Sequence, residues 1–173
     1  MMRTEVGRVG ITGQRLDHLY RVHIDEAFRL AYLLTGNRAL AEDLAQDAFV
    51  RLMGRFMHVR RPGDFAAYLR RTVVNLANSH YRRRGVERRY LRSQAGMRQP
   101  EMVQPDQGVR DQMRLALLTL PRRQRTAIVL RFYEDLSESQ TAEIMRCRTG
   151  TVRSLVSRGM ETLRSVVGGP RDE

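Results

Sequence analysis

The chain has 173 residues and carries 31 basic against 19 acidic side chains, which gives a formal net charge of +12. Every basic residue is an arginine, and the single cysteine, Cys147, excludes an internal disulfide and a cysteine-built zinc site. No run approaches the roughly 18 consecutive apolar residues of a membrane span, and residues 1–13 lack the apolar core of a signal peptide. We therefore expect a globular cytoplasmic protein, without membrane insertion, that binds a polyanion.

Three helices are expected in the first half of the chain. Apolar residues recur with helical spacing from Leu16 to Leu34, and Gly36-Asn37 ends that run. A second amphipathic helix, ending near Gly54, is predicted by apolar residues that recur every four positions: Leu40, Leu44, Ala48 and Leu52. Pro62-Gly63-Asp64 then breaks the chain and offers Asp64 as the N-cap of a long third helix. The residues expected to form its buried stripe are Phe65, Leu69, Thr72, Val73, Leu76 and His80.

The second half begins after a stretch that predicts a flexible linker. Residues 93–109 contain two prolines and two glycines, few apolar side chains and no periodicity. Helices are expected over 109–120 and 122–133, and Ser137 with Gln140 fits a capping box that opens a short helix through Cys147. Arg148-Thr149-Gly150 is the expected turn before a last helix over 151–167. The fold class is all-α, with two small helical domains, and the second is a helix-turn-helix.

The expected last helix has two unlike faces. The apolar face consists of Val152, Leu155, Val156, Gly159, Met160 and Leu163. The opposite face carries Arg153, Ser154, Ser157, Arg158 and Arg164. Arginine forks match guanine edges or phosphates, and serines bond to either, so this face predicts DNA binding. An ordinary solvated helix face is the alternative.

A second polar stripe is predicted along the third helix. Its members are Arg71, Asn75, Asn78 and Arg82, at positions i, i+4, i+7 and i+11. Such side chains can bond to base edges or hold a strand, and Tyr68 and Tyr81 add rings on which an unstacked base can lie. The arginines that follow are Arg83, Arg84, Arg88, Arg89 and Arg92. Either a bound polyanion or a solvated tail would relieve their mutual repulsion.

The second helix is acidic on its predicted exposed side, at Glu42, Asp43, Gln46 and Asp47. The helix dipole explains the first two acids but explains Asp47 less well, so a docking face for a basic protein is the sharper alternative. The four histidines lack metal-binding spacing, and no phosphate-binding glycine loop or nucleophile motif occurs. We therefore expect no enzyme activity, no metal and no cofactor.

Three separated motifs carry a family resemblance. Residues 41–49 read AEDLAQDAF, and residues 67–78 read AYLRRTVVNLAN before an arginine triplet. The third motif is formed by residues 120–125, LPRRQR, residues 130–137, LRFYEDLS, and residues 150–154, GTVRS. In this order they resemble the polymerase-binding helix, the promoter-melting segment and the −35-binding helix-turn-helix of the sigma-70 family. The two-domain layout is similar to the extracytoplasmic-function group, close to its actinobacterial SigE-like subfamily.

The resemblance implies a sigma factor that directs core RNA polymerase to promoters. It implies a region 2-like domain at 14–92, a linker at 93–109 and a region 4-like domain at 110–170. The residues implied to bind polymerase are Asp43, Gln46 and Asp47. Those implied to bind the −10 element are Arg71, Asn75, Asn78, Arg82, Arg83 and Arg84. Those implied to enter the −35 major groove are Thr151, Arg153, Ser154, Ser157 and Arg158.

The implied partners are the clamp helices of the largest polymerase subunit, the flap of the second, double- and single-stranded promoter DNA, and an anti-sigma factor. Leu155 and Met160 stand where relatives commonly carry basic residues, which predicts fewer or shifted −35 contacts. Two other classes of protein fit the residues. One is a repressor or activator that uses the helix-turn-helix alone, which should dimerise on a palindrome. The other is an adaptor whose arginines bind acidic proteins.

Overall fold

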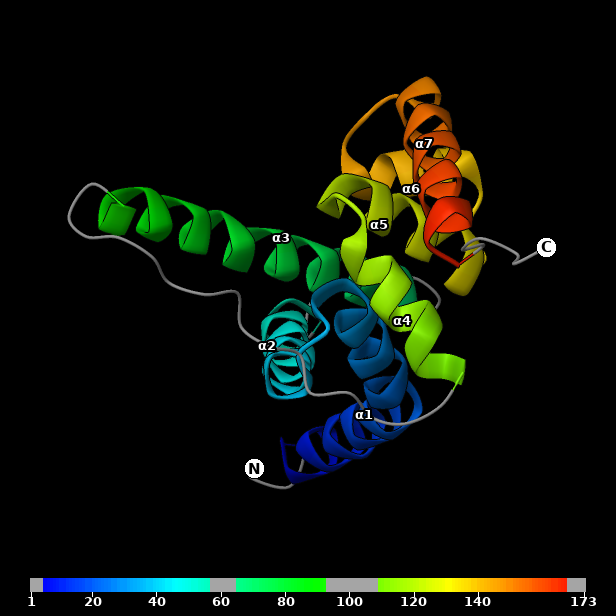
Figure 1. Ribbon diagram of the computed structural model, residues 1–173. Coiled ribbons are helices and arrows are strands. Elements are labelled where there is room, and N and C mark those ends of the chain that lie inside the picture. The colour runs from blue at the N-terminus through cyan, green and yellow to red at the C-terminus, as the bar shows by residue number, and fades with distance from the viewer. Residues whose placement is uncertain (1–4, 57–64, 93–108, 168–173) are drawn as a thin grey trace.

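The computed structural model describes residues 5–56, 65–92 and 109–167, and these form helices and turns without a strand. The first unit contains α1 (Glu5–Thr35), α2 (Arg38–Phe56) and α3 (Phe65–Arg92). The second contains α4 (Val109–Thr119), α5 (Arg122–Ile128), the π-helical turn η2 (Val129–Tyr133), α6 (Glu138–Met145) and α7 (Thr149–Val167) (Figure 1). The all-α prediction is confirmed. Asp64 and the expected linker, apart from Val109, lie outside the described residues.

The turn between α1 and α2 is made by the two residues that the sequence indicated. Gly36 adopts a left-handed φ of 69°, and its N–H donates to the carbonyl of Tyr32 at 2.7 Å. The side-chain oxygen of Asn37 accepts the N–H of Leu40 at 2.9 Å and so caps α2. The helix α1 begins at Glu5, well before the first periodic residue, Leu16. Apolar periodicity marks a buried helix face, so it does not by itself report where a helix begins.

The first unit is a three-helix core in which α3 buries more of its surface than a single stripe. The predicted residues Phe65, Leu69, Val73 and Leu76 are buried as expected. Thr72 and His80 are only half-buried, and Val74 and Ala77 are buried instead. The correction has a simple cause, because α3 packs against both α1 and α2 and therefore buries more than one stripe. Thr72 satisfies its hydroxyl locally by donating to the carbonyl of Tyr68 at 2.7 Å.

The second unit confirms the predicted capping box. Gln140 N–H donates to the Ser137 hydroxyl at 3.1 Å, and Ser137 N–H donates to the Gln140 side-chain oxygen at 2.8 Å. The predicted helix over 122–133 is one continuous run whose last turn is π-helical, because Glu134 N–H reaches the carbonyl of Val129 at 3.1 Å. The capping box therefore fixes where α6 begins, close to the end of η2.

The predicted turn at Arg148-Thr149-Gly150 is wrong by two residues. Arg146 adopts the left-handed conformation at φ 50°, and Cys147 N–H donates to the carbonyl of Ala142 at 3.0 Å, so α6 is closed at that point. The carbonyl of Arg148 then accepts the N–H groups of Thr151 and Val152, and α7 begins at Thr149. The chain therefore reverses direction at Arg146, whereas the sequence predicted a turn that contains Gly150. Cys147 is half-buried.

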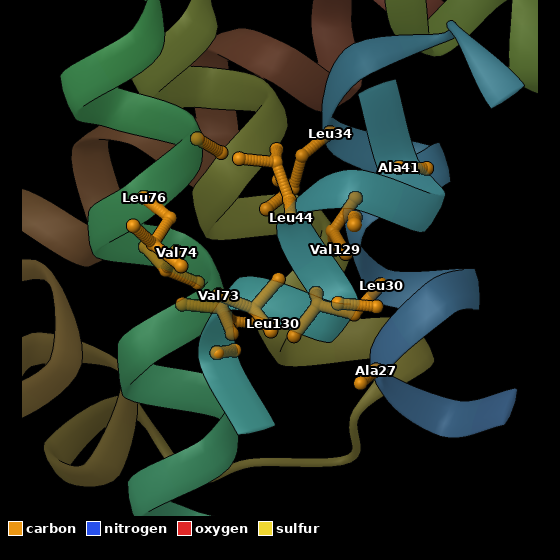
Figure 2. Packing of buried hydrophobic residues seen from close by; sticks show 14 of the residues in the cluster. Ala27, Leu30, Leu34, Ala41, Leu44, Val73, Val74, Leu76, Val129 and Leu130 are labelled. Atoms are coloured by element: carbon orange, nitrogen blue, oxygen red, sulfur yellow. The ribbon is translucent and has the colours of Figure 1, made fainter. Parts of the chain in front are cut away.

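One apolar cluster joins the two units. Figure 2 shows Val129 and Leu130 of η2 together with Leu30 of α1 and Val73 of α3, and all four are fully buried. Gly36 takes part because a Cβ there would come within 2.5 Å of Leu118 Cδ1 on α4. The second half of α3, in contrast, projects away from the other helices (Figure 1).

A buried arginine ties the C-terminal ends of two helices together. Arg125 is 8% exposed, and its guanidinium donates to the carbonyl of Leu34 at the end of α1 at 2.6 Å. It also donates to three carbonyls at and after the end of α4, those of Leu117, Leu118 and Leu120, at 3.0, 3.0 and 3.2 Å. Burial lowers the pKa of Arg125 below its ordinary value. The last carbonyls of a helix have no partner within it, so Arg125 satisfies acceptors from both units at once.

Two further arginines cross the same interface from α3. Arg70 donates to Glu134 at 2.7 Å and to Glu26 at 3.2 Å, and the Glu134 side chain is 8% exposed. Arg71 donates to Glu143 of α6 at 3.4 Å. Burial raises the pKa of Glu134, while the Arg70 guanidinium opposes that rise. The start of α3 is therefore held against the second unit by charged as well as apolar contacts.

Candidate nucleic-acid interface

The polar face of α7 lies on the surface as the sequence predicted. Arg153, Ser154, Ser157, Arg158 and Arg164 are all exposed. Val152, Gly159 and Leu163 are buried, whereas Leu155, Val156 and Met160 are half-buried at the border of the two faces. Gly159 allows a close approach to α5, because a Cβ there would lie 2.6 Å from Ile128 Cδ1. The helix is thus anchored along one side and presents arginine and serine on the other.

Several contacts organise that exposed face. Arg153 Nε donates to Glu138 Oε2 at 2.6 Å, which links α7 to α6. The Ser154 hydroxyl donates to the carbonyl of Gly150 at 3.0 Å, and Arg158 Nε donates to the carbonyl of Ser154 at 3.3 Å. Thr151, the first expected −35 residue, is half-buried. The face is therefore partly ordered without DNA, and the terminal nitrogens of Arg153 remain for other acceptors.

The polar stripe of α3 is divided between the surface and the interface. Asn78, Arg82 and Arg83 are exposed, and Asn75 and Arg84 are half-buried. Arg71 is the exception, because it pairs with Glu143 of the second unit. The side chains of Arg88, Arg89 and Arg92 lie outside the described residues.

A hollow of about 410 Å³ opens beside Asn75, between α2 and α3. Its lining residues are Arg51, Leu52, Thr72, Asn75, Leu76 and Ser79. The ring of Tyr68 is 46% exposed. Tyr81 is engaged at the interface, since Arg122 lies 4.0 Å over its ring and its hydroxyl donates to the carbonyl of Thr35 at 3.2 Å. Tyr68 is therefore the more accessible of the two rings proposed for stacking, because Arg122 covers one face of Tyr81.

The acidic side of α2 is a separate surface. Glu42, Asp43, Gln46 and Asp47 are all exposed, as predicted. Glu42 pairs with Arg38 at 3.1 Å and Asp47 pairs with Arg51 at 3.3 Å, both within α2. The opposite face of the helix is buried through Leu44, Ala48 and Leu52. Figure 1 places α2 beside α1 and α3 and places α7 in the second unit away from α2, so the acidic side of α2 and the polar face of α7 lie apart.

Across residues 5–56, 65–92 and 109–167, no helix is long and apolar enough to cross a bilayer. Among the same residues, no group of three or more His, Cys, Asp or Glu side chains is arranged to hold a metal ion. Sequence reasoning missed the interface residues Arg70, Arg125 and Glu134. Nothing in their local pattern distinguishes them from the many exposed arginines and acids of the chain.

Comparison with known proteins follows this division of the chain. Residues 19–87 match the family described as Sigma-70 region 2, and residues 110–163 match Sigma-70, region 4. The chain is 38% identical over 154 residues to ECF RNA polymerase sigma factor SigE of Mycolicibacterium smegmatis, covering 86% of this chain and 60% of that one. It is 30% identical over 156 residues to ECF RNA polymerase sigma factor SigW of Bacillus subtilis, covering 83% of each.

Solved structures agree on the fold. The chain is similar, with a TM-score of 0.75 and 24% identity, to the sigma factor RpoE of Bartonella quintana, solved with the anti-sigma factor NepR, covering 91% of this chain and 99% of that one. Along the chain, the region 2 match precedes the region 4 match. The chain belongs to the extracytoplasmic-function group of the sigma-70 family. Members of this family are transcription initiation factors and not enzymes.

Proposed function

We propose that the chain binds core RNA polymerase and directs it to specific promoters. In this proposal α7 reads the duplex of the −35 element, and α3 melts the −10 element and traps one of its strands. The observation that carries it is the exposed arginine and serine face of α7, backed by a buried face in a helix-turn-helix. The exposed Asn78, Arg82 and Arg83 and the hollow beside Asn75 support the role of α3.

The same proposal assigns the partners and the compartment. The exposed acidic side of α2, with Asp43, Gln46 and Asp47, binds the clamp helices of the largest polymerase subunit, and the second unit binds the flap of the second subunit. An anti-sigma factor is a further partner, supported by the similar RpoE structure, which contains one. The protein acts in the cytoplasm, where polymerase works. Run-off transcription with core polymerase, with and without the chain, tests the whole assignment.

Replacing Arg153 or Arg158 with alanine should weaken binding to −35 duplex. A lost bidentate base contact costs about 1–3 kcal/mol and relaxes preference at one position, whereas a lost phosphate contact lowers affinity for all sequences and reduces the salt slope by about one. We would measure binding by fluorescence anisotropy at several salt concentrations. The control is Arg21→Ala, because Arg21 is an exposed arginine of the first unit that pairs with Asp17 on the same helix, α1. Full activity of both variants on promoters that need a −35 element would show that α7 is not the reading helix.

Replacing Asn75 or Asn78 with alanine should impair promoter opening and leave closed-complex formation intact. Both side chains reach the surface of α3, so the free energy of unfolding should change by less than about 0.5 kcal/mol. Permanganate reactivity of −10 thymines reports opening, and thermal denaturation reports stability. Gln112→Ala, an exposed amide on α4, is the matched control. Unchanged thymine reactivity in both asparagine variants would contradict the strand-trapping role.

A further inference from the structure

A short ion pair joins the two helices of the helix-turn-helix at the end nearest the predicted DNA surface. Glu138 is the first residue of α6, and its Oε2 accepts a hydrogen bond from Arg153 Nε at 2.6 Å. The side chains are 36% and 71% exposed, respectively. Exposed ion pairs contribute little to the stability of the fold. Any role of this pair is therefore to be sought in binding.

The backbone positions of both Glu138 and Arg153 are fixed by neighbouring contacts. The reciprocal hydrogen bonds between Ser137 and Gln140 set the first turn of α6, which carries Glu138. Arg153 directly follows Val152, which is fully buried and sets the rotation of α7 about its axis. The carboxylate therefore meets the arginine at a defined place in the free protein.

Because Arg153 uses its Nε to bind Glu138, only its two terminal nitrogens are left to bind DNA. A guanidinium has five N–H donors, one on Nε and four on the two terminal nitrogens. With Nε given to Glu138, the terminal nitrogens form the remaining fork, whose spacing matches O6 and N7 of guanine. The adjacent carboxylate also disfavours a phosphate neighbour, because two negative charges would then lie close together. The pair thus favours an end-on contact with a base edge over a contact with the DNA backbone.

We infer that Glu138 is a positioning residue for −35 recognition, which aims the fork of Arg153 at a guanine in the major groove. The inference rests on the proposed reading role of α7. Glu138 acts through Arg153 and restrains its side chain before DNA arrives, so less side-chain freedom is lost on binding. It also contributes a negative charge beside the DNA. Removing that charge should therefore raise general affinity while base preference falls, whereas damage to the fold would lower both.

The test uses the full chain and a pool of short duplexes with randomised sequence, in which base frequencies are compared between bound and input DNA. Arg153→Ala should remove a guanine preference at one position. Glu138→Ala should reduce the preference at that same position by about two- to fivefold, the size expected for an exposed ion pair. Its averaged affinity for the unselected pool should be equal to or above that of the wild type. Glu138→Gln keeps an oxygen that can accept from Nε, so it should retain more of the preference than Glu138→Ala.

A matched control separates charge from position. Glu161→Ala removes an exposed acid from α7 two turns beyond Arg153, and it should leave the guanine preference unchanged. Thermal denaturation of each variant checks the fold. If Arg153→Ala removes the preference and Glu138→Ala does not reduce it, the positioning role is refuted and the proposed function stands. A lost preference at a different position in Glu138→Ala would mean that Glu138 reads a base itself, which also refutes it. No change of preference in Arg153→Ala would refute the inference as well, whereas the reading role of α7 would be refuted only if Arg158→Ala also left every base preference unchanged.

Discussion

Replacing Arg125 with alanine should lower the free energy of unfolding by about 3 kcal/mol or more. A hydrogen bond to a charged group contributes about 1.5–3 kcal/mol, and each buried acceptor left without a donor costs about 1–3 kcal/mol. Arg125 donates to four carbonyls, those of Leu34, Leu117, Leu118 and Leu120. Leu34 also accepts from the Tyr81 hydroxyl and Leu117 from the Leu120 N–H, so the carbonyls of Leu118 and Leu120 lose the most. Relief of the desolvated guanidinium charge offsets part of the loss. The remaining cost is still among the largest that a single substitution can produce in this chain.

The measurement is denaturant unfolding followed by helical circular dichroism, with Arg123→Ala as control because Arg123 is exposed on the same helix. Arg125→Lys should recover little, since a lysine ammonium has three donors on one atom and cannot match the planar fork. Because the broken hydrogen bonds include the one to α1, unfolding should also become less cooperative between the two units. A loss below about 1 kcal/mol for Arg125→Ala would show that water replaces the guanidinium at little cost.

The double substitution Gln46→Ala with Asp47→Ala should weaken binding to core polymerase at least tenfold. Truncating one partner of a buried, hydrogen-bonded charge pair at an interface costs about 2–5 kcal/mol, much of it from the opposing charge left unpaired. Both residues are exposed on the side of α2 opposite the core, so the fold should survive. In the free protein the double substitution breaks the exposed ion pair of Asp47 with Arg51, which stabilises the fold by at most about 1 kcal/mol.

Fluorescence anisotropy of labelled chain titrated with core polymerase measures this loss, and circular dichroism checks helicity. Asp17→Ala removes an exposed acid from α1 and serves as control. Binding of the full chain to −35 duplex without polymerase should be the same in wild type and double variant. Equal affinity for core in both proteins would contradict the docking face, and operator binding that never depends on polymerase would favour the repressor alternative.

Local signals allowed the helices and the exposed faces to be predicted from the sequence. Each of these signals acts within a few residues and can therefore be read from the local sequence. Examples are Gly36-Asn37, the Ser137–Gln140 capping box and the apolar period of α7. The same holds for the polar side chains of α2 and α7, which oppose an apolar stripe on their own helix. Such patterns predict which face of a single helix is buried and which is exposed.

Contacts between distant segments could not be predicted in this way. The bond from Arg125 to Leu34 and the pair of Arg70 with Glu134 join residues far apart in the chain, and neither side carries a distinctive local pattern. The reversal at Arg146 was missed for a related reason, because an arginine in the left-handed conformation contradicts the local preference for glycine. Burial of Val74 and Ala77 likewise depends on two neighbours of α3 and not on α3 itself.

The interface that joins the two units limits the distance over which α3 and α7 can contact DNA at the same time. In the proposed function, α3 and α7 serve promoter elements about 25 base pairs apart, a separation of about 85 Å along the duplex. A folded chain of 173 residues has a radius of gyration of about 16 Å, so the docked arrangement cannot touch both elements together. Only the fraction of molecules with separated units is competent, and the apparent Kd equals the intrinsic Kd divided by that fraction. When the docked state dominates, each gain of about 1.4 kcal/mol in its stability raises the apparent Kd about tenfold, and a partner that binds the separated state reverses this loss.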